Sequence, residues 1–258
     1  IFGGWNHETS RFALENFIRG TLKTAEKGLF NTSAHSINYI ESHDGYTLGD
    51  FIRISLDHSK NEQKFENKRA LTYLSQQESA IAKLSALTLF VSQGITMIHA
   101  GQEWARSKLI FDSSNLDKRA GMLDHDSYNK DNETNWLNFN EIEINKGLFE
   151  YYIGLIELRM SSPALRKALP SDINFKVYRD PLHLTFSIQT NEDLDPYEYF
   201  ISLNGNPKKE HSIDLLPGKW ELMADKNSIK LNKAKITIEN SYTLAPSSGV
   251  ILRRLRIM

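Results

Sequence analysis

Two short apolar segments, each followed at once by polar residues, stand on either side of the longest helical pattern in the chain. The first is Ile37–Ile40, and the second follows Gly94 as "ITMIHAGQEW". Between them, residues 69–92 carry apolar side chains at helical spacing. A strand, a long helix and a second strand in succession predict a parallel sheet, because parallel strands need such a crossover. We expect the first strand to be buried and both strands to end in functional residues.

The rest of the N-terminal part is predicted to be helical or irregular. Apolar spacing predicts helices over residues 10–25, 48–56 and 147–160, the last ending before the proline of "SSPAL". Residues 105–140 are polar and poor in helical signals. A connection of this length is usually functional or disordered.

Beyond residue 169 the apolar residues recur with a period of two. The alternating segments are "INFKVYR", "LHLTFSIQT", "YEYFISLN", "HSIDLL", "KWELMAD", "KITIEN", "SYTLA" and "GVILRRLRI", and Asn, Gly, Pro and Asp turns separate them. This pattern predicts an antiparallel β-sandwich domain. We therefore predict two domains, residues 1–165 and residues 166–258, and a fold class of α/β plus all-β.

Composition excludes several function classes. The chain has 258 residues, a net charge of -1 and 24% charged residues, so no basic surface points to nucleic acid. No apolar run is long enough to cross a membrane. Cysteine is absent, which excludes disulfides, thiol nucleophiles and cysteine-bound zinc. The compartment stays open among secreted, periplasmic and cytoplasmic, and we interpret the start "IFGGWNHETSRF", which lacks methionine, as internal.

The pair His43-Asp44 follows the first predicted strand. Such a pair is often only a structural turn, although its position at a strand end favours a site. No G-x-S-x-G element supports a nucleophilic serine. A calcium loop opened by Asp124 would place Asn129 at the glycine position and Asn135 at the bidentate glutamate position, and both are wrong for that loop. We therefore expect no metal and no cofactor.

The string "DNETNW" within the polar loop has the chemistry of a sugar-binding site. Its carboxylates and amides can pair with vicinal hydroxyls, and its aromatic faces can stack on sugar rings. The residues concerned are Tyr128, Asp131, Asn132, Asn135 and Trp136. The alternative is a surface loop anchored by a buried Trp136, and spacing alone does not decide between the two.

Three motifs in register resemble the α-amylase superfamily, glycoside hydrolase family thirteen. They are "INYIESHDGYTL", "GITMIHAGQEWARSK" and "DSYNKDNETNWLNF", and they look like the last third of its debranching enzymes, the pullulanases, isoamylases and glycogen debranching hydrolases. "LFEYYIGLIELRMSSPAL" is similar to the final barrel helix of that branch. The resemblance implies strands seven and eight of a (β/α)₈ barrel (TIM barrel), with their helices, followed by the β domain. It also implies an α-glucan polysaccharide or oligosaccharide as the binding partner.

The same resemblance implies roles for individual residues. Asp44 matches the aspartate that binds and distorts the sugar at the cleavage subsite, as a transition-state stabiliser, and His43 matches a histidine that contacts the same sugar. Substrate contacts are further implied for Tyr46, Arg106 and Trp136. Asp131 and Asn135 match loop positions that bind a donor-side glucose, whereas Glu103, near the end of the eighth strand beside Gln102, is expected to be structural.

One departure limits this interpretation. Retaining glycosidases need a nucleophilic carboxylate and a separate acid/base carboxylate, and the "GFRxD"-like motif of the nucleophile is absent. We therefore expect a C-terminal fragment of a retaining enzyme that hydrolyses α-1,6 branch linkages when joined to its missing N-terminal part. The fragment alone is expected to be inactive. An α-1,4-acting amylase of the same family and a non-catalytic glucan-binding module remain the alternatives.

Overall fold

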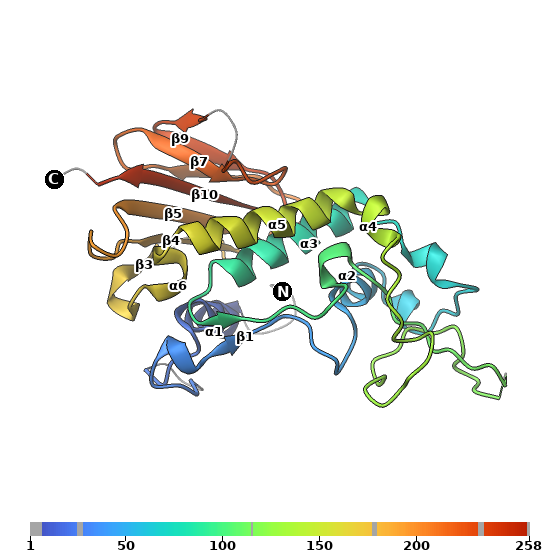
Figure 1. The fold of residues 1–258 in the computed structure, drawn as a ribbon. Coiled ribbons are helices and arrows are strands. Elements are labelled where there is room, and N and C mark those ends of the chain that lie inside the picture. Colours follow the sequence, from blue (N-terminus) through green and yellow to red (C-terminus); the bar gives the residue numbers. More distant parts are fainter. Residues whose placement is uncertain (1–6, 25–27, 115, 177–179, 232–234, 257–258) are drawn as a thin grey trace. The chain divides into compact units, whose positions relative to one another are not determined.

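The computed structural model describes residues 7–24, 28–114, 116–176, 180–231 and 235–256 (Figure 1). The helices are α1 (His7–Arg19), α2 (Leu48–Leu56), α3 (Gln76–Phe90), α4 (Glu141–Ile144), α5 (Lys146–Ser161) and α6 (Ala164–Lys167). The strands are β1 (Ile37–Asn38), β2 (Ile95–Thr96), β3 (Ile173–Lys176), β4 (His183–Ile188), β5 (Tyr197–Asn204), β6 (His211–Asp214), β7 (Trp220–Ala224), β8 (Thr237–Ile238), β9 (Ser241–Leu244) and β10 (Ser248–Leu255). None of these helices is both long enough and apolar enough to cross a bilayer.

The described residues fall into two compact units. The first comprises the residues up to Asn38, residues 83–96 and the chain from Ile153 onward. The second comprises residues 39–82 and 97–152. Because the chain passes between the units within α3 and α5, each unit is built from separate stretches of sequence. The predicted domains 1–165 and 166–258 remain a prediction.

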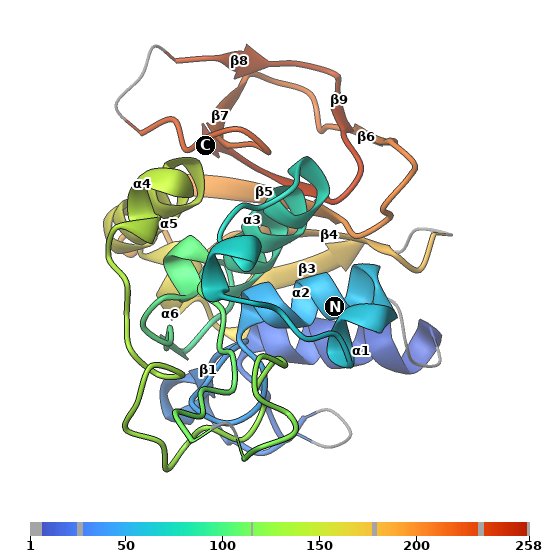
Figure 2. The same cartoon turned by 90° about the vertical axis from the view of Figure 1, so that its right-hand side faces the viewer.

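Antiparallel strands dominate the first unit. Six strands form one sheet in the order β3-β4-β5-β10-β7-β8. β6 and β9 form a second sheet (Figure 2). One apolar cluster draws residues from both sheets: Phe200, Ile213, Leu215, Trp220, Leu222, Leu244, Val250 and Leu252. Phe200 of β5 packs on this cluster, and β5 is buried on both faces from Glu198 to Asn204. Each of the eight β segments predicted beyond residue 169 overlaps one of the strands β3 to β10, and the predicted positions 177–179 and 257 lie outside the described residues.

The first unit also contains the predicted parallel strand pair. β1 runs parallel to β2, with Ile37 opposite Ile95 and Asn38 opposite Thr96. The prediction that the first strand is buried is wrong, because Ile37 is more than half exposed, as is Ile95 opposite it. The buried member is Asn38, whose side-chain amide donates to the carbonyl of Gln93 at 2.5 Å and whose oxygen accepts from Ser36.

A buried arginine fixes the chain where α3 gives way to β2. Nη1 of Arg159 donates to the carbonyls of Phe90 and Ser92, each at 2.8 Å, and Nη2 donates to that of Gly94 at 2.6 Å. Gly94 has φ +104°, and a Cβ there would lie 2.7 Å from the carbonyl oxygen of Ser33. The turn into β2 therefore requires glycine.

Two predicted helices have the wrong boundaries. The helix expected over residues 10–25 is α1, which ends at Arg19 because Gly20 takes φ +97°. The helix expected from Arg69 begins only at Gln76, after a 3₁₀ turn at Lys68–Leu71. Ser75 starts it, since its hydroxyl accepts from the amide of Glu78 and the Glu78 carboxylate accepts from the amide of Ser75. α2 matches its predicted range, and α5 matches within one residue at each end.

Candidate functional site

The His43-Asp44 pair belongs to the second unit, on the irregular stretch before α2. Nε2 of His43 lies 3.4 Å from Oδ1 of Asp44, and the side chains are 70% and 73% exposed. Gly45 follows with φ +75° and with nothing near the position that a Cβ would take. The turn therefore presents both side chains to solvent.

A buried lysine holds this turn by its backbone. Nζ of Lys108 donates to the carbonyl of His43 at 3.2 Å and to that of Gly45 at 2.9 Å. Its own amide donates to Oδ2 of Asp50 at 2.8 Å. Burial lowers the pKa of Lys108, and the positive charge of Arg106 lowers it further. The carboxylates of Glu41, Asp124 and Asp50 oppose this effect, and the two hydrogen bonds from Nζ hold the turn from beneath.

The start of α2 is fixed to the same support. The hydroxyl of Thr47 accepts from the amide of Asp50 at 3.1 Å, as an N-cap, and donates to the carbonyl of Arg106 at 2.8 Å. The Asp50 carboxylate lies 3.4 Å from Nη1 of Arg53, and both side chains are buried. Burial raises the pKa of Asp50, and Arg53 opposes this effect. A buried ion pair of this kind is costly to break by removing one partner.

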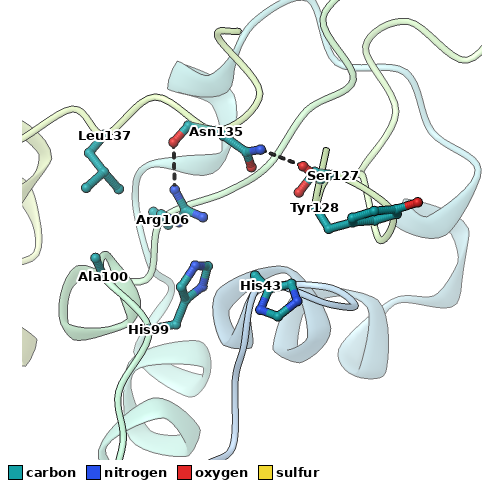
Figure 3. Close-up of a pocket in the computed structure, with 8 residues that line it drawn as sticks. All are labelled: His43, His99, Ala100, Arg106, Ser127, Tyr128, Asn135 and Leu137. Atoms are coloured by element: carbon teal, nitrogen blue, oxygen red, sulfur yellow. Dashed lines mark hydrogen bonds between the residues drawn. The ribbon is translucent and has the colours of Figure 1, made fainter. Parts of the chain in front are cut away.

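A pocket of about 220 Å³ opens beside the turn (Figure 3). It lies wholly within the second unit and is lined by His43, His99, Ala100, Arg106, Ser127, Tyr128, Asn135 and Leu137. Nη1 of Arg106 donates to the carbonyl of Asn135 at 3.1 Å, and the side-chain amide of Asn135 donates to the carbonyl of Ser127 at 2.6 Å. These bonds draw the polar loop against the residues that follow β2.

The pocket brings together residues from all three sequence motifs. Of the predicted site residues, four line it: His43, Arg106, Tyr128 and Asn135. Asp44 and Asp131 are exposed and are not among its lining residues. Tyr46 is half-buried, and its hydroxyl donates to Oδ1 of Asn61 at 2.6 Å. The roles proposed for these residues remain predictions.

Trp136 lies outside the pocket. It is 61% exposed, so the alternative of a buried anchor is wrong. Its side chain lines a separate groove of the second unit, together with Tyr73, Asn138 and Asn140. An exposed indole among amides has the composition of a sugar-stacking surface.

Sequence reasoning missed His99, Ala100, Ser127 and Leu137 as lining residues. A signal for His99 was present, because this residue follows β2 as His43 follows β1, and parallel strands bring their carboxyl ends to one edge. Ser127 and Leu137 had no comparable signal. They reach the pocket only because the loop between residues 105 and 140 folds back. Its described residues contain no helix or strand, as predicted.

The chemistry of the pocket favours binding over bond cleavage. Imidazole, guanidinium and amide groups offer donors and acceptors to hydroxyls. Arg106 is 6% exposed, and within the described part of the chain its Nε has no hydrogen-bond partner. Burial lowers the pKa of Arg106, although the carboxylates of Glu41 and Asp50 oppose that effect. The eight lining residues include no carboxylate that could serve as nucleophile or acid.

Asp124, considered above as a calcium ligand, has a different partner. Its Oδ2 lies 2.5 Å from Nζ of Lys130, and its Oδ1 accepts from the amide of Asp126. Among the residues with described coordinates, no group of three or more His, Cys, Asp or Glu side chains could hold a metal ion.

Known proteins match this chain in sequence and in fold. A glycogen debranching enzyme of Pectobacterium atrosepticum is 30% identical over 149 residues, which are 51% of this chain and 20% of that protein. A pullulanase of Bacillus subtilis is 29% identical over 140 residues, 54% of this chain and 16% of that protein. The chain is homologous to pullulanases and glycogen debranching enzymes. No family model matches it.

The solved pullulanases share the fold of nearly the whole chain. Pullulanase type I from Bacillus subtilis, complexed with maltose, covers 96% of this chain with a TM-score of 0.70 and 20% identity. The Group B Streptococcus pullulanase in complex with maltotetraose covers 99% with a TM-score of 0.74 and 18% identity. The chain spans about a third of the length of these two structures and about a fifth of the length of the two curated relatives.

Proposed function

We propose that this chain is the C-terminal part of a retaining glycoside hydrolase that cleaves α-1,6 branch linkages in α-glucans. In this proposal the pocket beside His43 binds a glucose unit next to the scissile bond. The exposed carboxylate of Asp44 then stabilises the distorted, oxocarbenium-like sugar, with hydrogen bonds that strengthen in the transition state. The nucleophile and the acid/base carboxylate come from the part of the protein that precedes this chain.

The observation that carries the proposal is the pocket itself. His43, Arg106 and Asn135 come from three separate motifs, and all three line one hollow of about 220 Å³. The resemblance implies a sugar contact for each of these side chains, and the residue types of "DNETNW" independently suggest one for Asn135. The names of the homologues add support, since they are glycogen debranching enzymes and pullulanases.

The finer fold belongs to the same proposal. β1 and β2 would be strands seven and eight of a (β/α)₈ barrel, with the remaining strands in the preceding part. The two antiparallel sheets that share the Trp220 cluster would form the predicted β-sandwich. The predicted division at residues 165 and 166 would then separate the barrel from this domain.

The test uses the full-length protein that carries this chain. We expect it to release maltotriose from pullulan, whose α-1,6 links join maltotriosyl units, and to leave linear amylose intact. Cleavage of amylose but not of pullulan would instead identify an α-1,4-acting amylase. Glucan binding without cleavage of either polymer would identify a non-catalytic binding module, and absence of both would refute the proposal.

A further inference from the structure

Glu41 is a buried carboxylate that joins one residue of the pocket to the start of α2, and the mechanism above does not use it. Its side chain is fully buried, and Oε1 lies 2.8 Å from Nδ1 of His99. Oε2 accepts the amide of Leu48, the first residue of α2, at 2.9 Å. One carboxylate therefore holds a ring that lines the pocket and satisfies a helix N-terminus, which lacks internal acceptors.

The geometry determines which nitrogen of His99 carries the proton. A carboxylate only accepts hydrogen bonds, so Nδ1 must donate to Glu41. In the neutral imidazole the other nitrogen, Nε2, is then an acceptor. The His99 side chain is 23% exposed and lines the pocket with His43 and Arg106 (Figure 3). Arg106 can only donate, so the pocket needs acceptors as well if it is to bind hydroxyl groups.

We infer that Glu41 is a positioning residue that fixes His99 in the Nδ1-protonated form, so that Nε2 accepts a hydrogen bond from a glucan hydroxyl. This inference rests on the proposed function of the pocket. It adds His99 as a substrate-binding residue and assigns a purpose to a carboxylate that is neither nucleophile nor acid.

Replacing Glu41 with glutamine should change the tautomer of His99. The amide of Leu48 can only donate, so the glutamine oxygen must face it, and the glutamine NH₂ group must face Nδ1 of His99. A histidine can move its proton to the other nitrogen, whereas a buried backbone amide without an acceptor costs about 1–3 kcal/mol. Glu41→Gln should therefore give His99 a protonated Nε2 in place of a protonated Nδ1.

The first measurement is nitrogen NMR of the full-length protein labelled with ¹⁵N-histidine, at a pH of about 8, where histidine is ordinarily neutral. The signals of His99 are those lost in His99→Ala. We expect protonation at Nδ1 in the wild type and at Nε2 in Glu41→Gln. A wild type protonated at Nε2 would overturn the inference, even if the variant does not fold.

The second measurement is a double-mutant cycle on maltotetraose affinity. His99→Ala and Glu41→Gln should each weaken binding by roughly three- to tenfold, the value of one hydrogen bond. Because Glu41 acts through His99, adding Glu41→Gln to His99→Ala should change nothing further. Glu103→Gln is the matched control, because Glu103 accepts the amide of Gly101 at 2.9 Å and does not line the pocket. It should bind like the wild type.

The outcomes separate the two proposals. Additive losses in the cycle would show that Glu41 acts by supporting α2 alone and would overturn the positioning role. A wild type that does not bind maltotetraose would refute the glucan site, and with it the sugar-facing role of His99. In that case the tautomer measurement would still decide the pairing of Glu41 with His99.

Discussion

His183 makes the antiparallel sheets of the first unit sensitive to acid. It begins β4 and is 2% exposed, with Nε2 lying 2.7 Å from the hydroxyl of Ser202 and 3.1 Å from that of Thr185. Its ring centre lies 3.5 Å from that of His211 on β6. Burial and the neighbouring His211 lower the pKa of His183 to about 4, and Asp180 opposes them. A protonated His183 is therefore unfavourable in the folded state.

The sign and the size of the effect follow from proton linkage. Well above a pH of about 6.5 the imidazole is neutral in both the folded and the unfolded state, so it does not change the free energy of unfolding. Between about 6.5 and 4 the unfolded chain binds the proton and the folded chain does not, so the free energy of unfolding falls as the pH falls. With a folded pKa of about 4 against about 6.5 unfolded, the loss between pH 7.5 and pH 4.5 is about 2.5 kcal/mol as an upper value.

The assay is urea unfolding of the wild type and of His183→Gln at these two pH values. The variant should be less stable at pH 7.5, because it loses the packed ring, but the difference in its free energy of unfolding between the two pH values should be smaller by about 2 kcal/mol. His35→Gln, an exposed histidine of the same unit, is the control and should behave as the wild type. Equal pH dependence in the wild type and in His183→Gln would refute the reasoning.

Three further outcomes are expected. In the full-length protein, Asp44→Asn should lower kcat on pullulan by about 10²-fold with little change in KM, as for other preorganised electrostatic contacts; a near-normal kcat would remove Asp44 from the mechanism. Asn135→Ala should raise KM for long oligosaccharides and also lower Tm, because the Asn135 amide donates to two loop carbonyls. Asp131 is exposed, so Asp131→Ala should raise KM without changing Tm. A fall in Tm for Asp131→Ala would contradict this. Gly94→Ala should lower the free energy of unfolding by about 1–3 kcal/mol in urea titration, given its positive φ and its close contacts, and a stability equal to that of the wild type would show that the turn relaxes.

The sequence predicted the β part of the fold better than the rest. The alternation of apolar residues predicted these strands, although most of β5 and the first five residues of β10 are buried on both faces. The parallel pair was predicted correctly, but its burial was not. Ile37 and Ile95 appear as core residues by type, and yet they lie on an exposed face of a two-residue ladder. The early end of α1 depends on Gly20, whose positive φ no apolar spacing reveals.

The candidate site could be predicted only in part. Resemblance and strand-end position pointed to His43, and motif similarity pointed to Arg106 and Asn135. The contacts that shape the pocket were out of reach, because Lys108, Arg106 and Glu41 act on partners between 7 and 65 residues away. The spacing of residues along the sequence does not indicate which distant residues form these hydrogen bonds. The exposure of Trp136 likewise depends on how the loop folds back, and not on its composition.

The way in which Lys108 and Arg106 hold the pocket has a consequence for how the site can change. Both cations bind main-chain carbonyls, those of His43 and Gly45 for the lysine and that of Asn135 for the arginine. Every residue type has such a carbonyl, so the support does not depend on which side chain is displayed. The side chain at position 43 can therefore be exchanged while the backbone keeps its path, whereas Gly45 is needed for its positive φ. On the proposed function, a library that varies position 43 and keeps the two cations would therefore test new sugar specificities on an unchanged backbone.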